Sequence, residues 1–375
     1  MLFGGLHRLS WYHSHLEVSR NAPFPSFRAR ALLSISLAVL QLVLVAPVSA
    51  ETPSSGSTAA PQSARVVTVY NPEAISAYVA RPDIVKDMVI RGITNLTRKA
   101  TVSEAWQSLV SKNDVVGIKV YSLPGANSGT RPSVVAAVVE GLLGAGLSPN
   151  NIIIWDKQPT DLRLAGYFDL AEKYGVRAAA STQSGYDMTN SYESAIIGTL
   201  VWGDVEFGQK GAGVGRRSFV SKLVSREITK IINIPPLLNH NLVGVCGNLY
   251  SLAFGSVDNV ARFETDPSRL AIAVPEIYAL PSLGDRVVLN LVDALICQYE
   301  GGEHGLLHYS TTLNELRFSK DPVALDVLSI RELDRQRGSA RSPNSKGNLD
   351  LYSNAALLEL GVSDPKRIDV ERIQP

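Results

Sequence analysis

Short β-branched runs alternate with helical stretches along most of this chain, and this alternation restricts the fold more than any other feature. "DVVGIKV" (114–120) is typical of a buried strand, "TRPSVVAAVVEGLLGAGL" (130–147) of a helix, and "NIIIWD" (151–156) of the next strand. Pro132 suits the first turn of that helix and Gly146 suits its end. Strand, helix and strand with short links predict a right-handed βαβ unit and a parallel sheet. The expected fold is therefore α/β, with a mainly parallel sheet flanked by helices, in one large or two coupled lobes.

The rest of the chain continues the pattern, with Gly and Pro marking the boundaries. Further strands are expected at 66–70, 195–207, 227–234, from 286 within 286–296, and at 366–373. Further helices are expected at 81–99, 241–254, 265–280, 320–338 and 352–360. Gly244 and Gly247 weaken the helix at 241–254 by about 1 kcal/mol each. The Gly-rich segment 208–217 lacks the spacing of a dinucleotide site or a P-loop, which favours an ordinary loop.

The first 50 residues predict a secretory signal peptide. Arg28 and Arg30 precede an apolar run from Ala31 to about Val45, and Val48-Ser49-Ala50 has the small residues of a cleavage site. The run is shorter than the roughly 20 residues that span a bilayer, which favours a cleaved signal peptide over the alternative, an uncleaved anchor. We therefore expect a secreted protein, periplasmic or extracellular, without a stable membrane span after cleavage. We expect residues 51–64 to form a flexible tether and residues 65–375 to form the α/β domain.

Charge and cysteine content exclude some function classes. Without the leader the chain has 32 basic and 34 acidic residues, which gives no electrostatic reason to expect nucleic acid or an anionic membrane as a partner. The two cysteines, Cys246 and Cys297, cannot ligate a four-cysteine iron–sulfur cluster, so no such cluster is expected. They form either one disulfide or two buried thiols, and their apolar surroundings favour thiols.

Polar side chains follow several of the predicted strands. Lys119, Asp156 and Asp293 lie near strand ends, and the strand at 227–234 leads into Asn239 and His240. In parallel α/β sheets the ligand crevice lies beyond the carboxyl ends of the strands. We therefore expect most of these groups to share one pocket, in which acid, base and amide groups meet.

Arg131 stands at the predicted start of the helix at 130–147. Backbone N–H groups and a guanidinium at a helix N-terminus hold a carboxylate or a phosphate well. The alternative is that Thr130 simply caps the helix.

Histidines are scarce beyond the leader, where only His240, His304 and His308 remain. A histidine that titrates near neutral pH in a site must be one of these three. Glu303, His304 and His308 are weak metal ligand candidates, because Gly301, Gly302 and Gly305 favour a loop and the HExxH order is absent. No metal is assigned on this pattern, and the cofactor is unknown.

Several segments together resemble the domain of unknown function (DUF) 362 family of bacteria and archaea. They are "DVVGIKV", "TRPSVVAAVVEGLLGAGLSPNNIIIWD", "TKIINIPPLLNHNLVGVCGNLYSLAFGSVDNVARFE" and "KDPVALDVLSIREL", and the resemblance runs from about Asn71 to Ile373. Members of that family are often exported, so the resemblance implies export, and it implies no particular activity. His240 matches the family, but Leu238 and Tyr250 stand where many relatives carry lysine, which indicates a divergent branch with a different or weaker ligand.

Two function classes remain open, with a third behind them. The first is an enzyme or ligand-handling protein that acts on a small polar or anionic molecule. In it Lys119 and Arg131 hold the anion and Asp156 orients the ligand or acts as acid or base. His240 transfers a proton, and two amides, Asn239 and Asn248, position it. The second is a non-catalytic exported binding or scaffold module, in which His240 satisfies backbone groups at a buried helix start. The third is a metal-binding protein.

Overall fold

The computed structural model describes residues 63–194, 214–342 and 348–375. All of them belong to one unit of the chain, Ala59–Pro375. The predicted signal peptide, most of the predicted tether and the predicted strand at 195–207 lie outside the described residues. The first described strand begins at Ala64, the last residue of the predicted tether.

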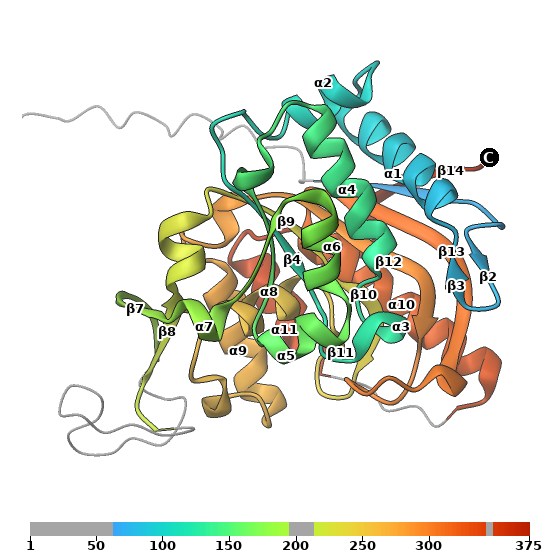
Figure 1. Cartoon of the computed structure of the whole chain (residues 1–375). Coiled ribbons are helices and arrows are strands. Elements are labelled where there is room, and N and C mark those ends of the chain that lie inside the picture. The colour runs from blue at the N-terminus through green and yellow to red at the C-terminus, as the bar shows by residue number, and fades with distance from the viewer. Residues whose placement is uncertain (1–62, 195–213, 343–347) are drawn as a thin grey trace, which may run out of the picture. The chain divides into compact units, whose positions relative to one another are not determined.

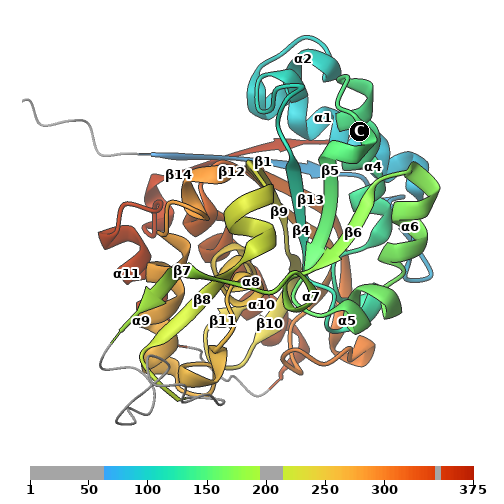
Figure 2. The same cartoon turned by 60° about the vertical axis from the view of Figure 1, so that its left-hand side comes forward.

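A mixed, mainly parallel sheet runs through the unit (Figures 1 and 2). Its strand order is β14 (Ile368–Ile373), β1 (Ala64–Tyr70), β13 (Ser310–Ser319), β12 (Val287–Gln298), β9 (Lys230–Ile234), β4 (Val116–Val120), β5 (Ile152–Asp156) and β6 (Arg177–Ala180). β12, β9, β4, β5 and β6 are parallel, β14 is parallel to β1, and β13 runs antiparallel to both of its neighbours. The predicted fold class is therefore confirmed.

Helices cover both faces of the sheet (Figure 1). One layer contains α1 (Pro82–Thr97), α2 (Val102–Gln107), α4 (Pro132–Gly144) and α6 (Tyr167–Tyr174), and the other contains α8 (Asn248–Ser256), α9 (Pro267–Tyr278), α10 (Pro322–Ala340) and α11 (Asp350–Leu357). Each layer has its own apolar core. Along β5, Ile152 and Ile154 belong to the core beneath α4, whereas Ile153 and Trp155 belong to the core beneath α8. A strand buried on both faces needs apolar residues at every position, which explains the continuous apolar runs.

The starts of the long helices follow from local sequence. Pro82, Pro132, Pro267 and Pro322 each occupy the first helical turn, where a missing N–H costs nothing. Asp321 also caps α10, because its Oδ1 accepts a hydrogen bond of 2.8 Å from the backbone N–H of Ala324. Each of these four helices begins within two residues of its prediction.

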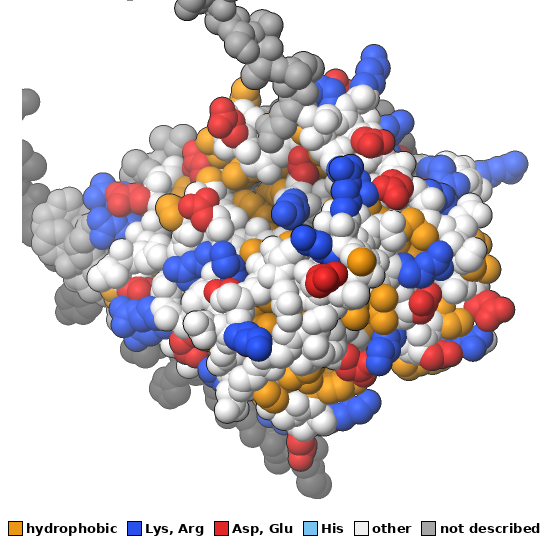
Figure 3. All heavy atoms as spheres, turned by 90° about the horizontal axis from the view of Figure 1, so that it is seen from above, with side chains coloured by type: hydrophobic (Ala, Val, Ile, Leu, Met, Phe, Trp, Pro, Cys, Tyr) orange, Lys and Arg blue, Asp and Glu red, His pale blue; other side chains and the backbone are white. Residues whose placement is uncertain are grey.

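Smaller elements complete the fold. They are β2 (Ile75–Ser76), β3 (Val79–Ala80), α3 (Gly125–Ser128), α5 (Pro159–Leu164), α7 (Ser181–Ser184), β7 (Tyr186–Glu193), β8 (Arg217–Ser221), β10 (Pro236–His240) and β11 (Gly244–Val245). β7 and β8 form a separate antiparallel pair. No helix in the described part of the chain is both long and apolar enough to cross a bilayer. Basic and acidic side chains are interspersed on the face drawn in Figure 3.

Two predictions about elements are wrong. The first half of the predicted helix at 241–254 is a turn followed by β11, which pairs antiparallel with β10, and the helix begins only at Asn248. Gly244 has a φ of +91°, a conformation that ends helical periodicity. Asp293 lies in the middle of β12 rather than at a strand end, because that strand continues to Gln298 and pairs there with β10.

Candidate functional site

A pocket of about 670 Å³ opens beyond the carboxyl ends of β4 and β12. β4 is the strand at which the sheet order reverses, since β5 lies on one side of it and β9 on the other. The pocket is therefore where the crevice rule predicts a ligand site. Its walls come from the segment after β4, the turn after β10, helix α8 and the loop after β12. Among its lining residues are His240, Tyr250, Phe254, Glu264 and Glu303.

Two backbone N–H groups hold the imidazole of His240. The amides of Leu242 and Val243 donate to Nδ1 at 3.2 and 3.3 Å. Because Nδ1 accepts from both, the proton of the neutral ring is on Nε2. Burial lowers the pKa of His240 and Glu303 partly opposes that shift, so the neutral ring is favoured. The ring lies 4.4 Å from the ring of Tyr250, centroid to centroid.

Three donors face one carboxylate oxygen of Glu303. Tyr121 and Tyr250 donate hydrogen bonds to Oε1, the second at 3.1 Å, and His240 Nε2 lies 4.0 Å from the same atom. Burial raises the pKa of both tyrosines well above the ordinary value, which keeps them protonated as donors. Oε2 of Glu303 has no hydrogen bond to any residue that the structure describes. We refer to His240, Tyr121, Tyr250 and Glu303 as the Glu303 cluster.

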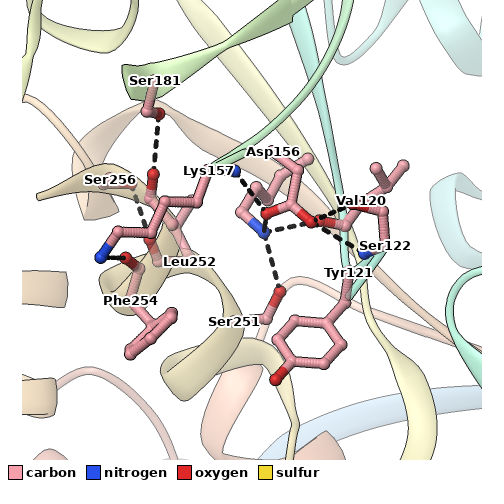
Figure 4. A network of polar contacts seen from close by, with 12 residues as sticks. Val120, Tyr121, Ser122, Asp156, Lys157, Ser181, Ser251, Leu252, Phe254 and Ser256 are labelled. Atoms are coloured by element: carbon pink, nitrogen blue, oxygen red, sulfur yellow. Dashed lines mark hydrogen bonds and ion pairs between the residues drawn. The ribbon is translucent and has the colours of Figure 1, made fainter. Parts of the chain in front are cut away.

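Lys119 and Asp156 form a buried ion pair at the ends of β4 and β5, and Figure 4 labels Asp156 among the surrounding polar contacts. The ammonium of Lys119 lies 2.8 Å from Asp156 Oδ1 and also donates to the Val120 carbonyl and the Ser251 hydroxyl. The other carboxylate oxygen accepts from the amide and the hydroxyl of Ser122, both at 2.7 Å. Burial lowers the pKa of Lys119, and the charge of Asp156 opposes that shift. Neither side chain lines the pocket.

Arg131 does meet an anion at the start of α4, but the anion is the protein's own Asp293. The guanidinium donates to Asp293 Oδ1 and the Arg131 amide donates to Oδ2, both at 2.9 Å. Thr130 does not cap the helix, because its hydroxyl donates to the Ile234 carbonyl. The pairing neutralises both side chains, and both are buried.

The two predicted positioning amides have other partners than His240. Asn239 bonds to Asn241 at 2.8 Å and accepts from Arg337. Asn248 donates its backbone N–H and its side-chain amide to Asp326 at 2.7 and 2.8 Å. The structure therefore brings His240 together with tyrosines and a glutamate instead. The sequence analysis missed Tyr121. Its position directly after β4 could have identified it, because polar side chains at the carboxyl end of a parallel strand face the ligand crevice.

The metal candidates do not converge. Glu303 points to the tyrosines, His304 lines the pocket, and the ring of His308 packs against Tyr309 at 4.2 Å. Across residues 63–194, 214–342 and 348–375, no group of three or more His, Cys, Asp or Glu side chains is placed to hold a metal ion.

Lys157 lies near the pocket, over the ring of Phe254 at 4.2 Å, and burial lowers its pKa to about 8.

Comparisons with known proteins identify a family for this chain. None of the curated proteins matches the chain. One similar solved structure is that of a protein from Thermotoga maritima, with 10% identity and a TM-score of 0.38. The similar region covers 72% of this chain and 61% of that one, so this chain spans less than two thirds of that protein. Residues 116–331 match the family described as "Domain of unknown function (DUF362)", and this range contains all four residues of the Glu303 cluster. The chain therefore belongs to the DUF362 family.

Proposed function

We propose that this protein binds a small polar molecule, neutral or positively charged, in the pocket over the Glu303 cluster. The observation that carries the proposal is the arrangement around Glu303. Two tyrosine hydroxyls donate to Oε1 and His240 Nε2 lies 4.0 Å from it, while Oε2 has no partner among the described residues and the side chain is 32% exposed. A carboxylate held in this way on one oxygen offers the other to a ligand donor.

The charge of the pocket favours a cationic or neutral ligand over an anion. Glu264 and Glu303 line the pocket, and no Lys or Arg does so among the described residues. Lys119 and Arg131, which the sequence suggested as anion holders, neutralise Asp156 and Asp293 instead. A ligand carboxylate would meet two like charges, whereas an ammonium group would gain a charge-assisted hydrogen bond.

The roles within the cluster follow from the same geometry. His240 accepts at Nδ1 and carries its proton on Nε2, so we assign it as a fixed hydrogen-bond donor rather than as the proton-transfer group. Glu303 is then the group that accepts a hydrogen bond or a proton from the ligand. Tyr121 and Tyr250 hold the carboxylate in place. These four side chains are sufficient for binding, so the proposal covers binding and assigns no reaction.

The test is a thermal-shift titration with three matched compounds: ethanolamine, ethylene glycol and glycolate. We expect ethanolamine to raise the melting temperature of the protein most and glycolate least. Glu303→Gln removes the negative charge and should abolish the preference for ethanolamine. Glu172→Gln, an exposed glutamate on α6, is the matched control and should retain it. A preference for glycolate, or one that Glu303→Gln leaves unchanged, contradicts the proposal.

We also propose that the protein is exported. The support is sequence alone: the apolar run from Ala31 to about Val45 and the small residues Val48-Ser49-Ala50. Expression of the full chain in a bacterial host, followed by fractionation and intact mass, tests this. We expect a periplasmic or secreted form that has lost 50 residues. An uncleaved form in the membrane fraction supports the anchor alternative, and an intact cytoplasmic form refutes export.

A further inference from the structure

A second concave surface, of about 890 Å³, lies between the β14–β1–β13 end of the sheet and helix α10. It shares no lining residue with the pocket over the Glu303 cluster. Four arginines line it: Arg317 from β13, Arg372 from β14, and Arg331 and Arg335 from α10. We call this surface the arginine groove.

Strand register brings two of these arginines to either side of one threonine. Thr68 on β1 lies opposite Arg317 on the antiparallel strand β13 and opposite Arg372 on the parallel strand β14. Residues directly opposite on neighbouring strands project from the same face of a sheet. The three side chains therefore form one row on the floor of the groove.

Helix α10 supplies the other wall. Arg331 and Arg335 are four residues apart, so they project from the same side of the helix. Arg335 is 64% exposed and pairs with Glu332 at 2.6 Å. Arg331 is exposed and makes no ion pair or hydrogen bond with any residue in the described part of the chain. The Thr68 hydroxyl likewise has no hydrogen bond to a described residue.

The acidic residues of the groove do not cancel its positive charge. Glu315 pairs with Arg317 at 2.7 Å and with Arg372 at 2.9 Å, and Glu332 pairs with Arg335. Four arginines and two glutamates leave two positive charges. Glu315 also keeps the guanidinium groups of Arg317 and Arg372 oriented. Arg331 and the Thr68 hydroxyl supply donors that the protein itself does not use.

From this arrangement we infer that the arginine groove binds a dianionic tetrahedral oxyanion, namely phosphate or the phosphate group of a small phosphate monoester. The two negative charges of such a group balance the two net positive charges of the groove. Its oxygens point in several directions and so meet donors from β1, β13, β14 and α10 together, whereas a planar carboxylate is satisfied by one bidentate arginine. The site is independent of the pocket over the Glu303 cluster, whose lining charge is negative.

Isothermal titration calorimetry on the full chain tests the inference, with inorganic phosphate and methyl phosphate as probes and acetate as the comparison. Ionic strength is held constant with potassium chloride, because non-specific attraction is screened by salt. We expect saturable binding of both phosphates with one site per chain, and much weaker binding of acetate. Binding of inorganic phosphate but not methyl phosphate assigns the free ion as the ligand.

Arg331→Gln is the diagnostic variant, because the side chain is exposed and has no partner to lose. We expect it to weaken phosphate binding about tenfold or more, as for loss of a hydrogen bond to a charged group. Thr68→Val should weaken binding as well. Arg163→Gln, an exposed arginine on α5 outside the groove, should leave it unchanged. Absence of saturable phosphate binding, or equal losses in Arg331→Gln and Arg163→Gln, overturns the inference.

Discussion

The ammonium of Lys119 lies 2.8 Å from a carboxylate oxygen of Asp156, and both side chains are buried. The pair joins the ends of two neighbouring parallel strands, β4 and β5, at the edge of the sheet where ligands bind in this class of fold. Ser251 accepts a hydrogen bond from the ammonium, and Ser122 donates to the other carboxylate oxygen (Figure 4). Two charges that the sequence suggests for a ligand therefore pair with each other instead.

Removal of one partner from this pair should be costly. Lys119→Met leaves Asp156 buried without its counter-charge, and we expect a loss of about 3–5 kcal/mol in the free energy of unfolding. The double variant Lys119→Met/Asp156→Asn carries no uncompensated charge and should lose less. Urea denaturation measures both. Lys86→Met breaks an exposed ion pair with Glu140 and should cost no more than about 1 kcal/mol. Equal costs for Lys86→Met and Lys119→Met would mean that the buried pair is not structural.

Gly247 is required by the carboxylate of Asp326. A Cβ at position 247 would lie 2.2 Å from Asp326 Oδ1, and that carboxylate is held by the backbone N–H groups of Asn248 and Leu249 at the start of α8. We expect Gly247→Ala to destabilise the protein by about 1–3 kcal/mol, because the carboxylate cannot move without losing these bonds. Gly144→Ala is the control. A Cβ there meets no atom within 4 Å, so the substitution should be neutral or slightly stabilising in thermal unfolding. The prediction fails if both glycines tolerate alanine.

Local sequence was sufficient for elements whose whole pattern lies within one segment. The strand at 114–120, the helix at 130–147 and the strand at 151–156 correspond to β4, α4 and β5. Local sequence was insufficient where pairing with another strand decides the secondary structure. The apolar spacing of 241–254 suits a helix, but pairing of His240 with Gly244 turns the chain into β11 first. β12 continues past Asp293 because β10 and β13 pair with its second half.

The site was predicted less completely than the fold, for the same reason. The strand-end rule correctly brought Lys119 and Asp156 together, but it does not say whether two charges face a ligand or each other. Asp293 is tolerated inside a strand only because Arg131, 162 residues away in sequence, meets it. Glu303 lies in a Gly-rich loop without periodicity, so no local sequence pattern predicts its hydrogen bond with Tyr121.

His240 should make the stability of the protein depend on pH below about 6.5. Burial lowers the pKa of His240 in the folded protein below the ordinary value of about 6.5 that applies in the unfolded chain. As the pH falls through that value, the unfolded chain takes up a proton that folded His240 does not. The free energy of unfolding therefore decreases with falling pH in this range and is insensitive to His240 above it.

His240→Gln should reduce this dependence. Urea denaturation at intervals between about pH 5 and pH 8 measures the slope that the linkage relation predicts. His308→Gln, an exposed histidine that does not line the pocket, is the control and should leave the slope as it is. An identical slope in wild type and His240→Gln would show that His240 is not the group responsible.

Both cysteines should be unreactive thiols in the folded protein. Cys246 and Cys297 are fully buried and unpaired. Burial raises the pKa of Cys297 to about 12 and that of Cys246 well above its ordinary value, so neither forms the thiolate that attacks a thiol reagent. Titration with a disulfide reagent should detect no thiol before unfolding and two after unfolding in urea without reductant. If the two thiols are instead oxidised to each other, the unfolded protein would show none until a reductant is added. Rapid labelling of the native protein would contradict the burial of both side chains.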